Sequence, residues 1–402
     1  MSAASKTPYA SPSPRTVSRS VTTVTAVVTA ITMSASGAAP TPLYHQYQEH
    51  FLLTPFMITI IFATYVLCLL FALLTVGSLS DYVGRRPSIL AALALNVAAM
   101  IVFMTAGSAA ALIGARAIQG FATGLALTTL AATILDTDNE RAPLLNSITV
   151  FVGLSVGTLG AGALVTFAPA PDQLVFAVLL LLSLVEALIL WFMPETATTK
   201  PGALGSLLPH VHVPKVARAT FAAVSPVNIA AWALGGFYFS LMPSVVRAAT
   251  GTELPILSGL VVASLTFAAA VAVVALRKLS AENMFVLGTV ALTTGVMLTL
   301  VGVESQNVGI MLFGTVVSGV GFGTVYSGTL RSLLPYALPG KRAGLLAAFF
   351  VEGYLSFSLP ALAAGFLAPV IGLTRTADFY GVGVILLAAT SLILRTDPRP
   401  GN

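Results

Sequence analysis

Residues 53–79 read LTPFMITIIFATYVLCLLFALLTVGSL, a stretch without a charged side chain. A helix of about 20 apolar residues crosses the hydrocarbon of a bilayer, where it satisfies its own backbone hydrogen bonds. The stretch therefore predicts a transmembrane helix, and comparable stretches recur along the 402 residues. Twelve spans are expected, over residues 21–39, 53–79, 87–106, 109–134, 145–167, 174–192, 220–246, 255–276, 284–303, 308–330, 343–370 and 379–394.

The composition excludes a soluble globular protein. Charged residues make up 8% of the chain and apolar residues 57%, whereas a soluble domain carries about 25% charged residues. The net charge of +5 does not indicate nucleic-acid binding, because the basic residues are spread over the loops. A phosphate-binding Gly loop is missing, and His210 with His212 is too small a set for a metal site. We therefore expect neither an enzyme nor a cofactor or metal site.

The distribution of Lys and Arg predicts the orientation in the membrane. With the N-terminus inside, one set of tails and loops holds sixteen of the nineteen basic residues. The opposite set holds only Arg247 and Arg375, and Arg116 lies within a span. Because cytoplasmic loops keep an excess of positive charge, we expect both termini in the cytoplasm, with the protein in the inner membrane of a bacterium.

An internal repeat at an offset of 201 residues predicts two six-helix halves. Arg141-Ala-Pro-Leu-Leu145 precedes the fifth span, and Arg342-Ala-Gly-Leu-Leu346 precedes the eleventh. The same offset places Gly120 on Gly321. Duplicated halves are common among transporters. The expected regions are a disordered cytoplasmic tail (1–20), an N-terminal six-helix bundle (21–193), a cytoplasmic linker (194–219), a C-terminal six-helix bundle (220–395) and a cytoplasmic tail (396–402).

The loop after the second span carries the sharpest motif, GSLSDYVGRRP over residues 77–87. It resembles G-x-x-x-D-x-x-G-R-R/K, the signature loop of the major facilitator superfamily, and the overall pattern is closest to the bacterial members similar to drug:proton antiporters. This resemblance implies two six-helix bundles that alternate in access, with the loop as a cytoplasmic latch. The latch residues it implies are Gly77, Asp81, Gly84, Arg85 and Arg86.

The resemblance also implies partners for the latch. Asp81 would meet the start of the eleventh span, and Arg85 would meet an acid at the end of the fourth span. Asp136 is the natural partner, with Asp138 and Glu140 as neighbouring alternatives.

Three charged residues inside spans are candidates for proton coupling or gating, because an intramembrane charge is costly and marks a functional site. Arg116 begins RAIQGFATG, which resembles a second superfamily motif whose Arg is linked to proton transfer or anionic groups. Glu352 lies near the middle of the eleventh span and is the first choice for the coupling carboxyl, although a structural hydrogen bond is the alternative. For Glu186 in the sixth span, structural pairing is the competing interpretation.

Polar and aromatic residues of the spans expected to line the cavity are candidates for substrate contact. Those chosen are Gln119, Asn228, Trp232, Tyr238 and Tyr326. Anchoring of Trp and Tyr at the membrane interface is the alternative interpretation.

Three functions fit these features. The leading one is proton-coupled export of a small, mostly apolar organic compound, a drug or a metabolite, by a monomer. The Gly-rich stretch 153–162 resembles the antiporter motif, with Thr158 where the family has Pro. The alternative is proton symport of a small organic acid or sugar, with Arg116 binding substrate charge. The third is a membrane sensor that has lost transport, against which the costly intramembrane charges argue.

Overall fold

The computed structural model describes residues 18–252, 254–336 and 342–396, and every regular element in these ranges is a helix. Most of the two predicted tails, residues 1–17 and 397–402, lies outside the described residues, as do residues 337–341 before the eleventh span.

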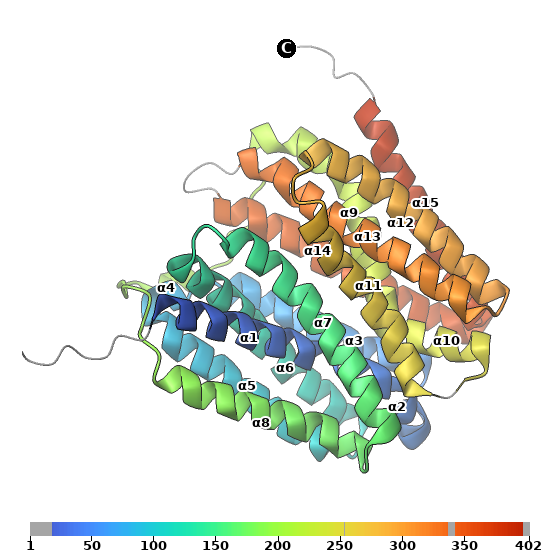
Figure 1. Cartoon of the computed structure of the whole chain (residues 1–402), viewed down its shortest axis with the longest axis horizontal. Coiled ribbons are helices and arrows are strands. Elements are labelled where there is room, and N and C mark those ends of the chain that lie inside the picture. Colours follow the sequence, from blue (N-terminus) through green and yellow to red (C-terminus); the bar gives the residue numbers. More distant parts are fainter. Residues whose placement is uncertain (1–17, 253, 337–341, 397–402) are drawn as a thin grey trace, which may run out of the picture.

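The first half of the chain, blue to green in Figure 1, forms one group of helices. Its elements are α1 (Arg19–Ala38), η1 (Thr41–Leu43), α2 (Tyr44–Phe51), α3 (Pro55–Val76), α4 (Ser80–Val83), α5 (Arg85–Met104), α6 (Ala109–Thr137), α7 (Ala142–Phe167) and α8 (Pro171–Trp191). A linker with two short turns follows, η2 (Ala203–Leu207) and η3 (Lys215–Ala217).

The second half, yellow-green to red in Figure 1, forms the other group. Its elements are α9 (Arg218–Ser240), α10 (Met242–Thr250), α11 (Pro255–Ala275), α12 (Ala281–Glu304), α13 (Val308–Leu333), η4 (Leu334–Tyr336), α14 (Arg342–Ile371) and α15 (Leu373–Thr396).

Twelve helical stretches of the described residues are long and apolar enough to cross a membrane, which confirms the predicted number of spans. The largest differences lie in the seventh and twelfth spans. The predicted helix 220–246 is interrupted at Leu241, where the backbone leaves the regular helix (φ −115°, ψ −22°) and α10 begins. The last helix begins at Leu373 rather than at residue 379.

Several long helices begin with a side chain that accepts a backbone hydrogen bond from the first turn, as N-cap residues do. Thr54 accepts from the backbone of Met57 at 3.2 Å at the start of α3. The other caps of this kind are Ser108 before α6, Ser280 before α12 and Asn307 before α13. These polar residues separate neighbouring apolar stretches and fix where each span starts.

Glycines lie where helices cross most closely. Their contacts also show which glycines of the two halves are structurally equivalent. A Cβ on Gly120 of α6 would collide with the backbone oxygen of Tyr65 on α3. In the second half, Gly319 of α13 meets Leu265 of α11 in the same way, whereas Gly321 faces α12. The structural counterpart of Gly120 is therefore Gly319, two residues before the position that the offset of 201 predicted. Only a residue without a Cβ permits backbones to approach this closely.

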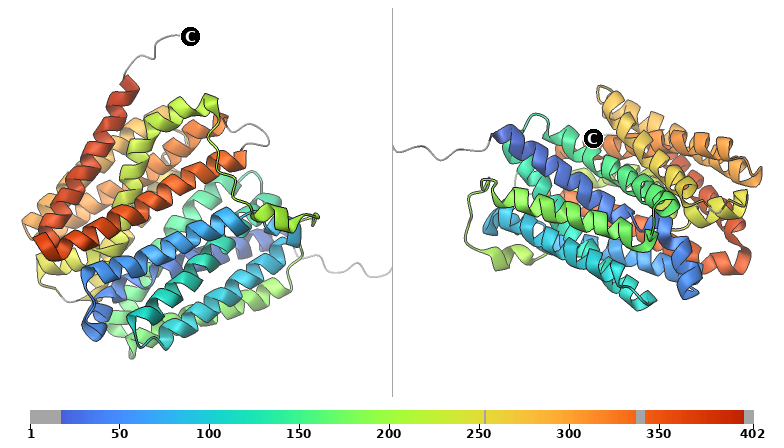
Figure 2. Two further views of the ribbon diagram at one scale, coloured as in Figure 1. Left: turned by 180° about the vertical axis from the view of Figure 1, so that it is seen from behind. Right: turned by 60° about the horizontal axis from the view of Figure 1, so that its bottom comes forward.

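The two halves meet mainly along two helix pairs, α7 with α11 and α3 with α14, and Figure 2 shows the groups side by side from two further directions. Small residues bring the first pair together, since a Cβ on Gly162 would lie 3.2 Å from the carbonyl oxygen of Pro255. Aromatic rings join the second pair, with Phe62 and Phe357 at 5.3 Å between centroids.

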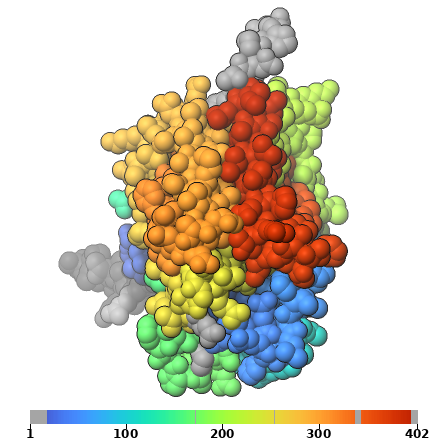
Figure 3. All heavy atoms as spheres, turned by 90° about the vertical axis from the view of Figure 1, so that its right-hand side faces the viewer, coloured from blue at the N-terminus to red at the C-terminus, as the bar shows by residue number. Residues whose placement is uncertain are grey.

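We call the side where α1 begins and α15 ends the termini face, and the opposite side the loop face. Polar contacts join the two halves at the loop face. Thr41 donates to the backbone oxygen of Phe239 at 3.2 Å, and Ser244 donates to Gln48 at 3.3 Å. This loop-face clasp consists of Thr41, His45, Gln48 and Glu49 from the first half and Phe239, Ser244 and Arg247 from the second. Figure 3 shows α10, in yellow, against the blue segment of the first half on this side.

The linker contacts both halves on the termini face. Ser78, next to the end of α3, donates to the backbone oxygen of Ser206 at 3.1 Å. Further on, the backbone of His212 donates to the backbone oxygen of Gly344 near the start of α14 at 3.2 Å. The linker therefore runs from the signature loop of one half to the beginning of α14 in the other.

Candidate functional site

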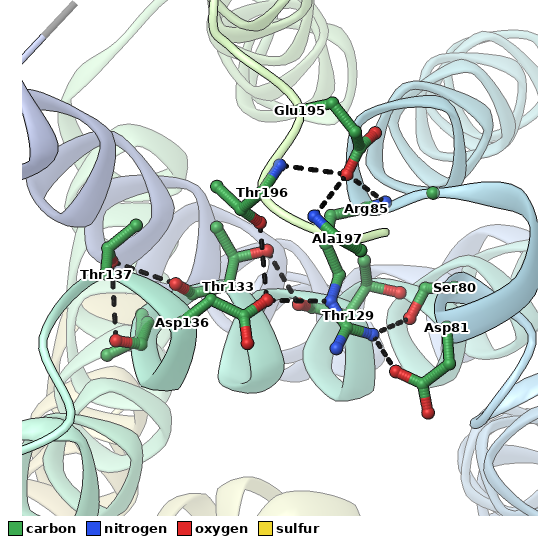
Figure 4. Close-up of polar contacts among 12 residues, drawn as sticks. Ser80, Asp81, Arg85, Thr129, Thr133, Asp136, Thr137, Glu195, Thr196 and Ala197 are labelled. Atoms are coloured by element: carbon green, nitrogen blue, oxygen red, sulfur yellow. Dashed lines mark hydrogen bonds and ion pairs between the residues drawn. The ribbon is translucent and has the colours of Figure 1, made fainter. Parts of the chain in front are cut away.

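Arg85 joins the signature loop to the end of α6 on the termini face (Figure 4). Its Nε donates to Asp136 Oδ2 at 3.1 Å. Its Nη1 lies 2.5 Å from Asp81 Oδ1 and donates to Ser80 Oγ at 2.7 Å. Arg85 thus makes the contact with Asp136 that the resemblance implied, and all four residues belong to the first half. The role of this cluster as a latch between states remains a prediction.

Glu195, in the linker, completes this cluster and was missed in the sequence. Its carboxylate accepts from the backbone N–H groups of Arg85 at 2.8 Å and Arg86 at 3.0 Å. These groups begin α5, where unpaired N–H groups and the helix dipole favour a negative charge. Thr196, the next residue, donates to Asp136 at 3.3 Å. The start of the linker is therefore bound both to the first backbone N–H groups of α5 and to Asp136 at the end of α6 (Figure 4).

The remaining latch residues shape the loop. Gly84 has φ +106°, in the left-handed range that favours glycine, and it leads directly into α5. Gly77 follows α3, where a Cβ would lie 3.5 Å from Thr128 on α6. The guanidinium of Arg86 lies 5.4 Å from the ring centre of Trp191. Among the described residues the ion pair of Asp81 is with Arg85, inside the first half, rather than with the start of the eleventh span, where the side chain of Arg342 lies outside the described residues.

Arg116 is fully buried in the first half and is stabilised by neutral groups. Its Nη1 donates to the backbone oxygen of Gly37 at 2.8 Å and to Gln119 Oε1 at 2.7 Å, and its Nη2 donates to the Tyr44 hydroxyl. The ring centre of Tyr65 lies 4.8 Å from the guanidinium, a cation–π contact. Within the described residues no carboxylate contacts Arg116. Dipoles and aromatic faces take the place of a counter-ion.

Glu352 lies on α14 opposite α9 and is held by two donors. Ser225 Oγ donates to one carboxylate oxygen at 2.5 Å, and Asn228 Nδ2 donates to the other at 2.7 Å. Asn228 is buried, whereas Glu352 and Ser225 are partly exposed. The carboxyl of Glu352 is therefore held by two hydrogen bonds and remains partly exposed, and its role in proton coupling stays a prediction.

Aromatic side chains surround Trp232, one turn beyond Asn228 on α9. Its ring centre lies 5.0 Å from that of Tyr354 and 6.4 Å from that of Tyr326. Phe151 of α7 reaches this group from the first half, edge-on to Tyr326 at 5.6 Å. We call Phe151, Trp232, Tyr326, Tyr354 and Phe357 the aromatic cluster. It lies where the two halves meet, beside Glu352.

Two buried polar atoms next to the cluster have no partner among the described residues. Asn228 uses its amide nitrogen for Glu352, and its Oδ1 is unpaired. The indole nitrogen of Trp232 is also unpaired. Buried polar groups are almost always satisfied, so this acceptor and this donor, one turn apart on α9, have hydrogen-bonding capacity that no described residue fills.

Glu186 and Tyr238 lie apart from this group. Glu186, on α8, is buried and accepts from Thr32 of α1 at 2.6 Å, within the first half. Tyr238 is fully buried in the second half, where its hydroxyl lies 2.9 Å from Thr315 and 3.3 Å from Thr299. The structure therefore does not bring Tyr238 to the other predicted substrate residues.

Of the predicted residues, Asn228, Trp232, Tyr326 and Glu352 are brought together in the second half, while Arg116 and Gln119 are adjacent in the first. Phe151 was not among the residues chosen from the sequence, although the offset of 201 makes it the position equivalent to Glu352. Among the described residues no three His, Cys, Asp or Glu side chains gather as metal ligands.

Comparison with known proteins identifies the family. The family model described as Major Facilitator Superfamily matches residues 23–350. The fold is similar to the xylose transporter XylE from E. coli, in a structure described as a partially occluded inward open conformation, with a TM-score of 0.71. The two chains are 14% identical, and the match covers 96% of this chain and 99% of the other. No curated protein matches the sequence. Together with the twelve spans in two halves, these findings show that the chain is a multi-pass membrane transporter, not an enzyme, and belongs to the major facilitator superfamily.

Proposed function

We propose that this secondary transporter exports a small, mostly apolar organic compound, a drug or a metabolite, in exchange for protons. The observation that carries the proposal is Glu352, an intramembrane carboxylate held by Ser225 and Asn228 beside the aromatic cluster. An ionisable carboxyl inside the membrane costs free energy, and such residues therefore mark functional sites. Here it adjoins rings that offer a large apolar surface to a substrate.

In this proposal the substrate packs on the aromatic cluster between the halves. Most ligand sites are apolar surfaces with a few placed polar groups. Trp232, Tyr326 and Tyr354 supply the apolar surface, and Phe151 closes it from the first half. Asn228 Oδ1 and the Trp232 indole nitrogen supply one acceptor and one donor.

Glu352 would carry the proton, and Arg116 would remain a fixed charge in the first half. The Arg116 guanidinium already donates to Gly37, Gln119 and Tyr44. This favours export of an apolar compound over symport of a small organic acid, because among the described residues only the buried Nε of the guanidinium is left without a partner to receive a substrate carboxylate. Glu186 stays a second candidate for proton binding, since one carboxylate oxygen is buried and unpaired.

The proposed orientation places the termini face in the cytoplasm of a bacterium. Sixteen of the nineteen basic residues belong to the tails, linker and loops that the sequence predicts for that side, and cytoplasmic loops keep an excess of positive charge. The loop-face clasp joins the halves on the outer side, which supports a conformation closed toward the outside. The Arg85 cluster would then act on the cytoplasmic side as the halves rock against each other.

Proton movement in proteoliposomes tests this function. Purified protein is reconstituted, and lipophilic cations, neutral drug-like compounds, sugars and small organic acids are added in turn. We expect proton movement opposite to a lipophilic compound, and no such movement with Glu352→Gln. Proton movement in the same direction as an acid or a sugar would favour the symporter, and silence across the panel would favour the sensor.

A further inference from the structure

A hydroxyl from α15 is inserted into the backbone of α9 beside the Glu352 site. Ser391 Oγ accepts from the backbone N–H of Val227 at 2.9 Å and donates to the backbone oxygen of Ala223 at 3.1 Å. These are the two groups that a regular helix would join directly, since N–H of residue i bonds the carbonyl of residue i−4. Ser391 is fully buried, so both bonds are made away from water.

Pro226 explains why α9 is open at this level. It lies inside the helix, has no N–H to donate, and its ring crowds the carbonyl of the preceding turn. In a membrane the freed backbone groups must be satisfied within the protein, and neighbouring Ser or Thr side chains do this. Ser391 therefore replaces one helical hydrogen bond of α9.

The insertion lies directly behind the donors of Glu352. Ser225 precedes Pro226, and Asn228 follows Val227. Ser225 and Asn228 bind the two oxygens of Glu352 at 2.5 and 2.7 Å. The backbone that carries both donors is the backbone that Ser391 holds. A change in this part of α9 would move Ser225 against Asn228 and loosen their grip on the carboxylate.

We propose that Ser391 is a positioning residue for the Glu352 site: its hydroxyl holds α9 open at Pro226 so that Ser225 and Asn228 both reach the carboxylate. The inference deepens the proposed function and rests on it for the role of Glu352 in transport. The placement of Ser225 and Asn228 on the carboxylate of Glu352 can be tested without knowing the substrate.

Two neighbouring residues provide matched variants. Ser391→Ala removes the hydroxyl, and Ser391→Thr keeps it. Thr390→Ala removes the adjacent hydroxyl of α15, which donates at 2.8 Å to Leu386 of its own helix and is exposed. A general effect of losing a hydroxyl from α15 would follow both Ala variants, whereas the positioning effect would follow Ser391→Ala alone.

The first measurement is the pH titration of the Glu352 carboxyl by infrared difference spectroscopy, with the band assigned by its loss in Glu352→Gln. Donors to a carboxylate favour the ionised form. Ser391→Ala should therefore move the titration to higher pH by about one unit, the effect of weakening one charged hydrogen bond. Ser391→Thr and Thr390→Ala should leave it near that of the unsubstituted protein. An unmoved titration in Ser391→Ala would overturn the proposal.

Hydrogen exchange of the α9 backbone provides a second readout that does not need transport. The Val227 amide should exchange faster in Ser391→Ala and remain slow in Ser391→Thr. Equal exchange in both variants would show that the Ser391 hydroxyl does not protect this amide and would contradict the proposal. Proton movement in proteoliposomes is measured on the same variants. If the titration moves but Glu352→Gln still couples proton movement to substrate, the positioning stands and the proposed proton role of Glu352 fails.

Discussion

Asn228 on α9 donates a hydrogen bond of 2.7 Å to Glu352 on α14, while its own carbonyl oxygen is buried and unpaired. The same amide therefore binds the carboxyl through its nitrogen and keeps its oxygen free, one helical turn before Trp232. A substrate bound there and a proton bound to Glu352 would share Asn228 as a neighbour. This arrangement gives a physical route by which occupancy of one site changes the other.

Replacing Glu352 with Gln should abolish proton coupling while substrate exchange persists. Gln is nearly isosteric with Glu and keeps a carbonyl oxygen for Ser225 or Asn228, but it does not bind a proton reversibly. The measurement compares proton-driven transport with exchange of labelled substrate across proteoliposomes at equal pH. Glu282→Gln, at the exposed start of α12, is the matched control. Proton-driven accumulation by Glu352→Gln at the normal rate would remove Glu352 from the mechanism.

Trp232 should contribute through both its ring and its indole nitrogen. Trp232→Phe keeps an aromatic side chain against Tyr354 and removes the unpaired donor. We expect the apparent affinity to fall about tenfold for substrates that carry a hydrogen-bond acceptor, as for the loss of one buried hydrogen bond, and to change little for substrates that carry none. Trp232→Ala should weaken both classes.

Competition binding to the purified protein distinguishes these outcomes. Tyr238→Phe is the control, because the Tyr238 hydroxyl is bound to Thr299 and Thr315 inside the second half. Equal losses for both substrate classes in Trp232→Phe would show that the indole nitrogen does not contact the substrate.

The fold follows from local features of the sequence. Apolar stretches such as 53–79 predict spans because each one satisfies its backbone by itself. The contact of Arg85 with Asp136 was predicted only through the resemblance of the signature motif to that of the family, since the two residues are 51 positions apart. Helix geometry could have indicated from the sequence that Tyr238 points away from Trp232. It lies six residues after Trp232, and at about 100° per residue its side chain points to another face of α9.

Other contacts between residues far apart in the chain could not be predicted from the sequence. Glu195 reaches Arg85 across 110 residues, and a single acid in a Pro-rich linker carries no pattern that points to α5. Ser391 looks like a small packing residue of an apolar span, and only Pro226 signals that a hydroxyl is needed nearby. The offset of 201 aligned Gly120 with Gly321, one of several glycines close together in that span. In the structure Gly319 is the glycine that lies at the crossing of α13 with α11, as Gly120 lies at the crossing of α6 with α3.

Glu195 should stabilise the first half through the start of α5. Glu195→Ala removes the acceptor of the backbone N–H groups of Arg85 and Arg86. Loss of a helix N-cap costs about 1 kcal/mol, so the melting temperature in detergent should fall, and Glu195→Gln should lose less because it keeps one acceptor. Glu140→Ala, an exposed carboxylate of the nearby loop, is the control. Equal melting temperatures for Glu195→Ala and Glu140→Ala would contradict the capping role.

The loop-face clasp should separate during transport. Ser244 donates to Gln48 at 3.3 Å across the two halves. The pair Gln48→Cys and Ser244→Cys, made in a Cys68→Ser background, should therefore cross-link readily under mild oxidation. If the halves must part at the loop face to exchange substrate with that side, the cross-link should stop transport and a reducing agent should restore it.

The control is the pair Gln48→Cys and Arg375→Cys, in which Arg375 is the other basic residue expected on that side. The measurement combines gel mobility of the oxidised protein with transport before and after reduction. Alternating access requires one side to be closed while the other opens, so a fully cross-linked protein that still transports at the normal rate would show that the loop face does not open in the cycle. A pair that fails to cross-link would contradict the closed clasp itself.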